Sequence, residues 1–177
     1  FTLNVKLAIE GFYNSQSNTL NMKDTVRAYI RSSNTPYNII DSAKSIVDSV
    51  NMTGNFQYYN ISAGTYYIST KHRNGLETWS KAGGESFTSD GIYNYDFTNN
   101  VSSAFGDNLV LKGSKYCIYS GDVNQDGTID ASDLSNVDND AFSSVSGYVN
   151  TDLNGDDLVD ATDVSIVDNN AFNAVSV

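Results

Sequence analysis

The chain of 177 residues contains one Cys, one Pro, one His and one Trp. It therefore has almost no Cys to cross-link the fold and almost no Pro to interrupt its strands and helices. A single Cys excludes an intrachain disulfide, and Cys117, between Tyr116 and Ile118, is interpreted as a small buried hydrophobe. The sequence has no run of about 18 apolar residues, so we predict no membrane insertion. It also has no recognisable signal peptide. We interpret Phe1 as the N-terminus left after cleavage, which predicts an extracellular protein. The low Lys content and the many Asn, Ser, Thr and Tyr residues are typical of a secreted bacterial protein of the cell surface.

The sequence also lacks the motifs of the common enzyme classes. It has no G-x-S-x-G, P-loop, HExxH or CxxC motif, and His72 is its only histidine. Glu10, Glu77 and Glu85 show no spacing that would pair two carboxylates for glycoside hydrolysis. We therefore interpret His72 as a strand residue with a hydrogen-bond partner and predict no enzymatic activity.

Basic residues are missing from the last third of the chain. Residues 121–177 hold 12 Asp and no Lys, Arg, Glu or His, whereas residues 1–120 hold nine acidic and all ten basic residues. The net charge of −11 is therefore −12 in the last third and +1 before it. A chain this acidic argues against nucleic acid or an anionic membrane as a partner.

The acidic residues of this last third form two loops of the same pattern. Residues 122–133 read DVNQDGTIDASD and residues 152–163 read DLNGDDLVDATD. Oxygen-bearing side chains at positions 1, 3, 5, 9 and 12, with the carbonyl of position 7, are what a 12-residue calcium loop requires. The sequence predicts two Ca²⁺ ions, whose ligands are Asp122, Asn124, Asp126, Thr128, Asp130 and Asp133 in the first loop and Asp152, Asn154, Asp156, Leu158, Asp160 and Asp163 in the second.

Calcium is expected to be linked to the folding of this segment, because two ions would neutralise four of its negative charges. The loops differ at position 6, where the sharp turn favours a positive φ. This position is Gly127 in the first loop and Asp157 in the second. Asp tolerates that conformation at some cost, so the second site is expected to be the weaker one.

The repeat continues beyond the loops. Residues 122–147 and 152–177 share 14 of 26 aligned positions. Each loop is expected to lead into a short helix, from Asp133 and from Asp163, and the two halves to form one unit. Ile129 and Val159 are expected to pair with each other in a short strand contact. The apolar residues expected to face inward between the halves are Leu134, Val137, Phe142, Val164, Val167 and Phe172.

Two calcium loops that end in Asp, each followed by one helix, resemble the type I dockerin domain over residues 121–177. The resemblance implies an extracellular bacterial module that docks onto a cohesin domain of a scaffold, with calcium held by the residues named above. The chain departs from the family at the docking positions. The family often has a Ser-Thr-like pair at loop positions 10 and 11 and basic residues later in the helix. The corresponding residues here are Ala131-Ser132, Ala161-Thr162, Asp138-Asn139 and Asp168-Asn169.

Residues 1–120 have the alternating pattern of β-strands. Residues 2–10 (TLNVKLAIE) and 25–31 (TVRAYIR) alternate apolar and polar positions. Other strand candidates are NFQYYNI, TYYISTKHR, LETWSKA, IYNYDFT, NLVLKG and KYCIYS, while SIVDSV is left open between a strand and a helical turn. Asn74-Gly75 indicates a hairpin. The predicted fold class is mainly β, an antiparallel β-sandwich over residues 1–120 followed by a small α-helical dockerin-like module over residues 121–177.

The segment AGTYYISTKHRNGLETWS is similar to the late strands of carboxypeptidase-regulatory and collagen-adhesin B-type sandwiches. That resemblance implies a spacer module of a secreted protein.

Three functions follow as hypotheses. The first is a calcium-stabilised structural protein whose copies assemble into a filament by strand addition, through the strand pattern FTLNVKLAIEGFY and the apolar segment AFNAVSV. The alternative is docking of the sandwich onto a cohesin-like scaffold partner. The third is carbohydrate binding by Trp79 and some of the 12 tyrosines, although alternating aromatic residues more often form cross-strand packing pairs. N-glycosylation sequons at Asn51, Asn60 and Asn100 add glycans as a candidate modification.

Overall fold

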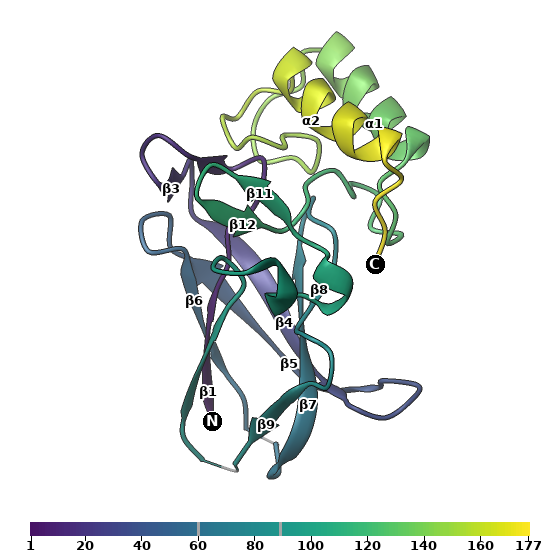
Figure 1. Ribbon diagram of the computed structural model, residues 1–177. Coiled ribbons are helices and arrows are strands. Elements are labelled where there is room, and N and C mark those ends of the chain that lie inside the picture. Colours follow the sequence, from purple (N-terminus) through teal and green to yellow (C-terminus); the bar gives the residue numbers. More distant parts are fainter. Residues whose placement is uncertain (60, 89) are drawn as a thin grey trace.

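The computed structural model describes residues 1–59, 61–88 and 90–177, so the sequon at Asn60 lies outside the described residues. The fold is mainly β, with two α-helices at the C-terminal end (Figure 1). One sheet has three strands in the order β10 (Ile92–Asp96), β1 (Thr2–Lys6) and β6 (Thr53–Gln57). The second has five strands: β5 (Ile39–Val47), β4 (Asp24–Ser32), β7 (Gly64–His72) and β8 (Thr78–Trp79) in order, with β9 (Glu85–Phe87) also paired to β7.

Smaller elements complete the first 120 residues. Two short hairpins join β2 (Tyr13–Asn14) to β3 (Thr19–Leu20) and β11 (Val110–Lys112) to β12 (Lys115–Cys117). Two 3₁₀ turns, η1 (Val101–Ser103) and η2 (Phe105–Asp107), lie between β10 and β11.

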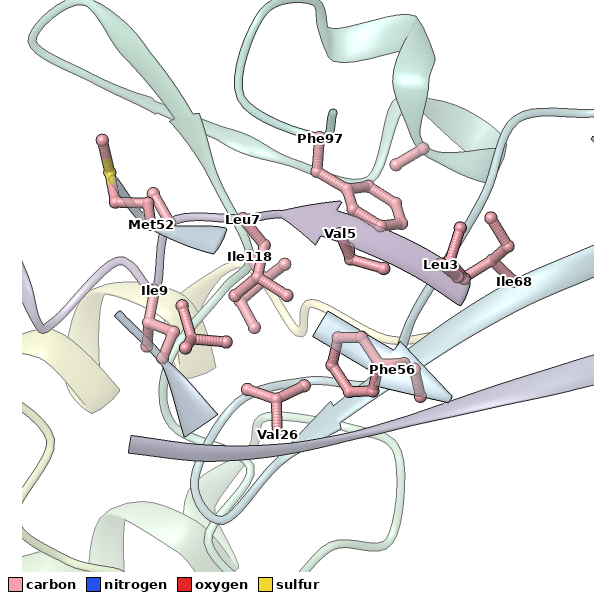
Figure 2. Packing of buried hydrophobic residues seen from close by; sticks show 14 of the residues in the cluster. Leu3, Val5, Leu7, Ile9, Val26, Met52, Phe56, Ile68, Phe97 and Ile118 are labelled. Carbon is pink, nitrogen blue, oxygen red and sulfur yellow. The ribbon is translucent and has the colours of Figure 1, made fainter. Parts of the chain in front are cut away.

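The two sheets pack in a sandwich-like arrangement around one apolar core. In β1, Leu3 and Val5 are fully buried while the residues between them are partly exposed, as the alternating sequence predicts. Val26 of β4 and Ile68 of β7 are also fully buried in the same core. Figure 2 shows these side chains meeting in the layer between the strands.

Strand direction departs from the prediction at one pair. β1 runs antiparallel to β6 but parallel to β10, with Thr2 opposite Ile92. Among the described strands the other pairs are antiparallel, and one isolated bridge, between Ile9 and Ile118, is also parallel. Alternation in sequence shows which residues face the core. The same alternation occurs in parallel and in antiparallel pairs, so it does not predict the direction of a neighbouring strand. The open segment SIVDSV (residues 45–50) is a strand in its first half, because β5 ends at Val47, and a turn follows at residues 49–50.

The N-terminal strand is an inner strand of its own sheet. β1 is paired on both sides, and the Phe1 ammonium donates a hydrogen bond to the Tyr58 carbonyl oxygen at 2.7 Å. Its apolar side chains are already buried in its own domain, so this placement gives no support to donation of the strand to a neighbouring copy.

The C-terminal part contains α1 (Ala131–Phe142) and α2 (Ala161–Phe172), which lie side by side at one end of the sandwich (Figure 1). Both helices begin two residues earlier than expected, because Asp130 and Asp160 act as N-caps. A second apolar core lies beneath the helices. It contains Val123, Ile129, Val137, Leu153, Val159 and Val167, together with Leu76 from the sandwich.

The expected direct pairing of Ile129 with Val159 is wrong. The Ile129 amide instead donates to Val175, which follows α2, and the Val159 amide donates to Val145, which follows α1. Each loop therefore pairs with the segment that follows the helix of the other half. This exchange makes the two halves one unit, as expected.

Among the described residues, no helix is long and apolar enough to cross a membrane.

The sandwich and the C-terminal part share a polar, closely packed interface. Asn170 of α2 donates from Nδ2 to Glu10 Oε2 at 2.7 Å and to the Ser120 carbonyl oxygen at 2.8 Å. A Cβ added to Gly11 would lie 1.9 Å from the carbonyl oxygen of Leu153, so only glycine fits at this approach. Because the backbones meet this closely, the two parts hold a defined mutual orientation.

Candidate functional site

Hydrogen bonds from backbone amides to carboxylate and amide side chains hold the first acidic loop in its turn conformation. Asn124 Oδ1 accepts from the Asp126 amide at 2.8 Å, and Asp126 Oδ1 accepts from the Thr128 amide at 3.0 Å. Asp130 Oδ1 accepts from the Ser132 amide at 2.7 Å and thereby caps α1. The side chains predicted as ligands are thus the same ones that shape the turn.

The second loop repeats this geometry residue by residue. Asn154 Oδ1 accepts from the Asp156 amide at 2.8 Å, Asp156 Oδ1 from the Leu158 amide at 3.0 Å, and Asp160 Oδ1 from the Thr162 amide at 2.7 Å. Leu158 and Thr128, whose carbonyls are predicted ligands, also occupy equivalent isolated bridges, to Ser146 and Ser176. The sequence repeat is therefore a structural repeat.

The last acid of each loop joins the start of the loop to the helix. Asp133 is fully buried, and its Oδ1 accepts from the Val123 amide at 2.9 Å while its Oδ2 accepts from the Asp130 amide at 3.1 Å. Asp163 makes the corresponding contacts with Leu153 and Asp160 at 2.7 and 3.0 Å. Each closes a capping box, so position 12 both closes the loop and fixes the first turn of the helix.

The chemistry of the first loop fits a cation. Asp122 is fully buried, and its Oδ1 has no hydrogen-bond partner among the described residues. Burial and the nearby Asp133 raise the pKa of Asp122 to about 6, because a charged carboxylate is poorly solvated there. An all-oxygen set around a buried, uncompensated carboxylate suits a hard divalent cation such as Ca²⁺. Among the described residues, however, no three His, Cys, Asp or Glu side chains are arranged as a metal-holding group. The two-ion prediction thus stays a prediction.

The turn conformation at position 6 is as expected in both loops. Gly127 has φ of 91°, and Asp157 has φ of 68°. The left-handed region costs a residue with a Cβ more than it costs glycine.

Asp157→Gly is therefore expected to stabilise the second loop by about 0.5–1 kcal/mol. Thermal unfolding and a calcium titration of the variant would measure the effect. Gly127→Ala is the matched change in the other loop and is expected to act in the opposite direction. Equal or lower stability of Asp157→Gly would contradict the assignment of strain to this position.

The sandwich supports the loops through residues for which the sequence carried no signal. Arg73 Nη2 lies 3.6 Å from Asp152 Oδ2, and Asn74 donates from Nδ2 to the Asp152 carbonyl oxygen at 2.8 Å. Asn21 Nδ2 donates to the Asn154 carbonyl oxygen at 2.9 Å. Asn74-Gly75 does lie in the turn of a hairpin, between β7 and β8, and this turn carries one of the contacts to the second loop.

His72 is buried in β7 with partners at both ring nitrogens, as expected of a strand histidine. Its Nδ1 lies 3.0 Å from Asn74 Oδ1, and its Nε2 lies 3.0 Å from Asp24 Oδ2. Asp24 also accepts hydrogen bonds from Arg73 Nε at 2.9 Å and from the Tyr148 hydroxyl at 2.5 Å. This cluster joins strands of the sandwich to the segment between α1 and the second loop.

Cys117 is buried as well, and burial raises the pKa of its thiol to about 12.

The last residue of each helix is an exposed phenylalanine, which corrects the expectation that Phe142 and Phe172 face inward. The side chains of Phe142 and Phe172 are 93% and 90% exposed, while Val137 and Val167 are buried. Each Phe follows its buried Val by five residues, which places it about 140° around the helix from the core-facing side. Leu134 and Val164 pack against the second core, as expected.

No protein-family model matches the chain, and no curated protein matches its sequence. Two solved structures from Acetivibrio cellulolyticus contain a chain of similar fold. Both are type II cohesin–X–dockerin complexes. The C-terminal interface mutant aligns with a TM-score of 0.57 at 17% identity, over 96% of this chain and 94% of that chain. The N-terminal interface mutant aligns with a TM-score of 0.51 at the same identity and coverage. At this identity the likeness shows the fold alone.

Proposed function

We propose that residues 121–177 are a calcium-stabilised, dockerin-like module that attaches the preceding sandwich to a folded, cohesin-like protein. The observation that carries the proposal is the exposure of Phe142 and Phe172 at equivalent positions of the two helices. Burying a Phe side chain against a partner stabilises the complex by roughly 1.5–3 kcal/mol. Two such side chains on one helix pair are suited to anchor a protein interface.

The charge around the phenylalanines defines the partner surface further. Asp138 and Asp168 are exposed one helical turn before the two phenylalanines, and the 121–177 segment has no basic residue. The partner is therefore expected to present apolar pockets bordered by Lys or Arg, because complementary charges speed and orient association. A dockerin of the usual type carries basic residues at these positions, so the cohesin that fits this chain differs in charge from the usual one.

Calcium would act on this surface through the loops. The ligands would be the carboxylates, amides and carbonyls predicted from sequence. The ion would neutralise the buried Asp122 carboxylate, whose Oδ1 has no hydrogen-bond partner among the described residues. Asp133 and Asp163 belong to the ligand sets and also close the first turn of each helix. Ion binding would therefore hold α1 and α2 in the orientation that presents Phe142 and Phe172. The similar chains come from cohesin–X–dockerin complexes, which supports a role in protein assembly.

The test is a binding assay against a panel of cohesins, with calcium and with a chelator. We expect calcium-dependent binding by calorimetry, and the double variant Phe142→Ala/Phe172→Ala should weaken it at least tenfold. Tyr59→Ala is the matched control, since Tyr59 is 86% exposed on the sandwich. Full affinity of the double variant, or no cohesin bound in calcium, would overturn the proposal.

A second candidate function is self-assembly by strand addition, and the exposed edge of β5 favours it. β5 forms one end of the five-stranded sheet, and its Ile39, Ile40 and Ile46 are about half exposed. An apolar edge strand can pair with a strand from another copy. Electron microscopy and light scattering, with and without calcium, would detect filaments, and Ile46→Lys should abolish them. Monomers under all conditions would exclude this candidate.

A further inference from the structure

A pocket of about 250 Å³ opens where the sandwich meets the C-terminal segment, because Val177 is among its lining residues. Four of its lining residues are aromatic and come from four separate segments. Tyr67 lies in β7, Trp79 in β8, Tyr37 in the loop between β4 and β5, and Phe105 in η2. Tyr37 and Phe105 are 40% and 53% exposed, so the aromatic surface is open to solvent.

The rings stand edge to face around Tyr67. Its ring centre is 5.9 Å from Tyr37, 5.8 Å from Trp79 and 6.1 Å from Phe105, with interplanar angles between 61° and 81°. Edge-to-face contacts fix the rings relative to one another. A rigid wall of ring faces is suited to an apolar surface of limited size, since little side-chain entropy is lost on binding.

The Glu77 carboxylate, which lines the pocket, is neutralised by Arg31. Arg31 Nη2 forms an ion pair with Glu77 Oε1 at 2.8 Å, and the Arg31 guanidinium carbon lies 4.6 Å from the centre of the Trp79 ring. Arg31 therefore already supplies the cation that an aromatic cage would otherwise attract. The pocket favours a neutral ligand over a cationic or an anionic one.

One polar group beside the rings remains available to such a ligand. Trp79 Nε1 has no acceptor among the described residues, but it is buried and lies out of a ligand's reach. Asn108 donates a hydrogen bond from Nδ2 to the Ser176 carbonyl oxygen at 2.9 Å. Its Oδ1 makes no hydrogen bond among the described residues and can accept one from a ligand. An acceptor beside aromatic faces matches a sugar, whose hydroxyls can donate to it and whose C–H faces stack on rings.

We propose that this pocket binds a neutral sugar residue, either free or as part of a polysaccharide. The size of the pocket suits one or two sugar rings rather than a larger ligand. The ring would stack on the aromatic wall, and a hydroxyl would donate to Asn108 Oδ1. The chain would then hold a glycan in this pocket and a protein on the exposed side of the helices.

Trp79 is the only tryptophan, so its fluorescence reports on the pocket directly. The experiment titrates the full chain with glucose, xylose, galactose, mannose, N-acetylglucosamine and cellobiose, and with choline as the cationic probe. We expect saturable changes with at least one sugar, at a dissociation constant of about 1 mM or below, and none with choline. Calorimetry with the same sugar should give the same constant.

Tyr37→Ala and Phe105→Ala are each expected to weaken sugar binding at least tenfold, and Asn108→Ala severalfold. Tyr59→Ala again serves as the exposed aromatic control and should leave binding unchanged. The proposal is overturned if no sugar gives a saturable change, if choline alone does, or if both aromatic variants bind as tightly as the original chain. These outcomes require no cohesin, so a failure of sugar binding is distinguishable from a failure of cohesin binding. The titrations are run in calcium, because Val177 lines the pocket and its amide donates to the Gly127 carbonyl oxygen of the first loop.

Discussion

Calcium added to metal-free protein is expected to stabilise residues 121–177 by about 5 kcal/mol when free Ca²⁺ is about 100 times the dissociation constant. Each of two sites would contribute roughly 2.7 kcal/mol under that condition. For a chain of this size the change corresponds to an increase in Tm of roughly 10–20 °C. Differential scanning calorimetry would measure it, and isothermal titration should give two ions per chain.

Asp122→Ala is expected to remove the first calcium site and to leave the second intact. It removes the buried carboxylate whose Oδ1 has no partner and should lower the stoichiometry from two ions to one. Asp138→Ala removes an exposed carboxylate from α1, outside the loop, and is the matched control. An unchanged Tm on chelation, or two ions still bound by Asp122→Ala, would contradict the assignment.

Asp24→Ala is expected to destabilise the chain by about 3–5 kcal/mol, since it breaks a buried charged cluster and leaves Arg73 Nε and His72 Nε2 without their partner. It also removes the acceptor of the Tyr148 hydroxyl, which links the sandwich to the C-terminal part. Urea unfolding would measure the loss. Asp48→Ala, at an exposed turn, is the control and should cost less.

The same cluster predicts a pH dependence. Burial alone would raise the pKa of Asp24, but hydrogen bonds from His72, Tyr148 and Arg73 outweigh it and hold the pKa well below its usual value. The carboxylate therefore contributes its full stabilisation above the unfolded pKa of about 3.9, and loses it as the pH falls towards the folded pKa. The difference in stability between the original chain and Asp24→Ala should shrink below about pH 4. A difference that stays constant down to pH 2 would contradict this explanation.

Much of the C-terminal part could be predicted from the sequence because its interactions are local. A loop of 12 residues carries its own hydrogen-bond acceptors, so the spacing of Asn124, Asp126 and Asp133 is enough to predict the turn and the start of the helix. The positive φ of Asp157 follows from the same local alignment. Strand positions in the sandwich were predictable for a similar reason, since alternation acts within one strand.

Other features depend on segments that are far apart in the chain. The parallel pairing of β1 with β10 joins residues 90 apart, and no local pattern encodes strand direction. The exposure of Phe142 and Phe172 depends on which face of each helix meets the second core. The contact of Arg73 with Asp152 and the aromatic pocket around Tyr67 each bring together segments that have no relation in sequence.

The sequence by itself determined the two acidic loops, their repeat, the helices that follow them and the mainly β character of the first 120 residues. These depend on spacing within about 12 residues, where backbone geometry leaves few alternatives. Only the tertiary structure decided how each loop pairs with the other half, which helix face stays exposed and how Tyr67 meets Tyr37, Trp79 and Phe105. These depend on packing between distant segments, where many arrangements satisfy the same local pattern and burial of apolar surface selects one.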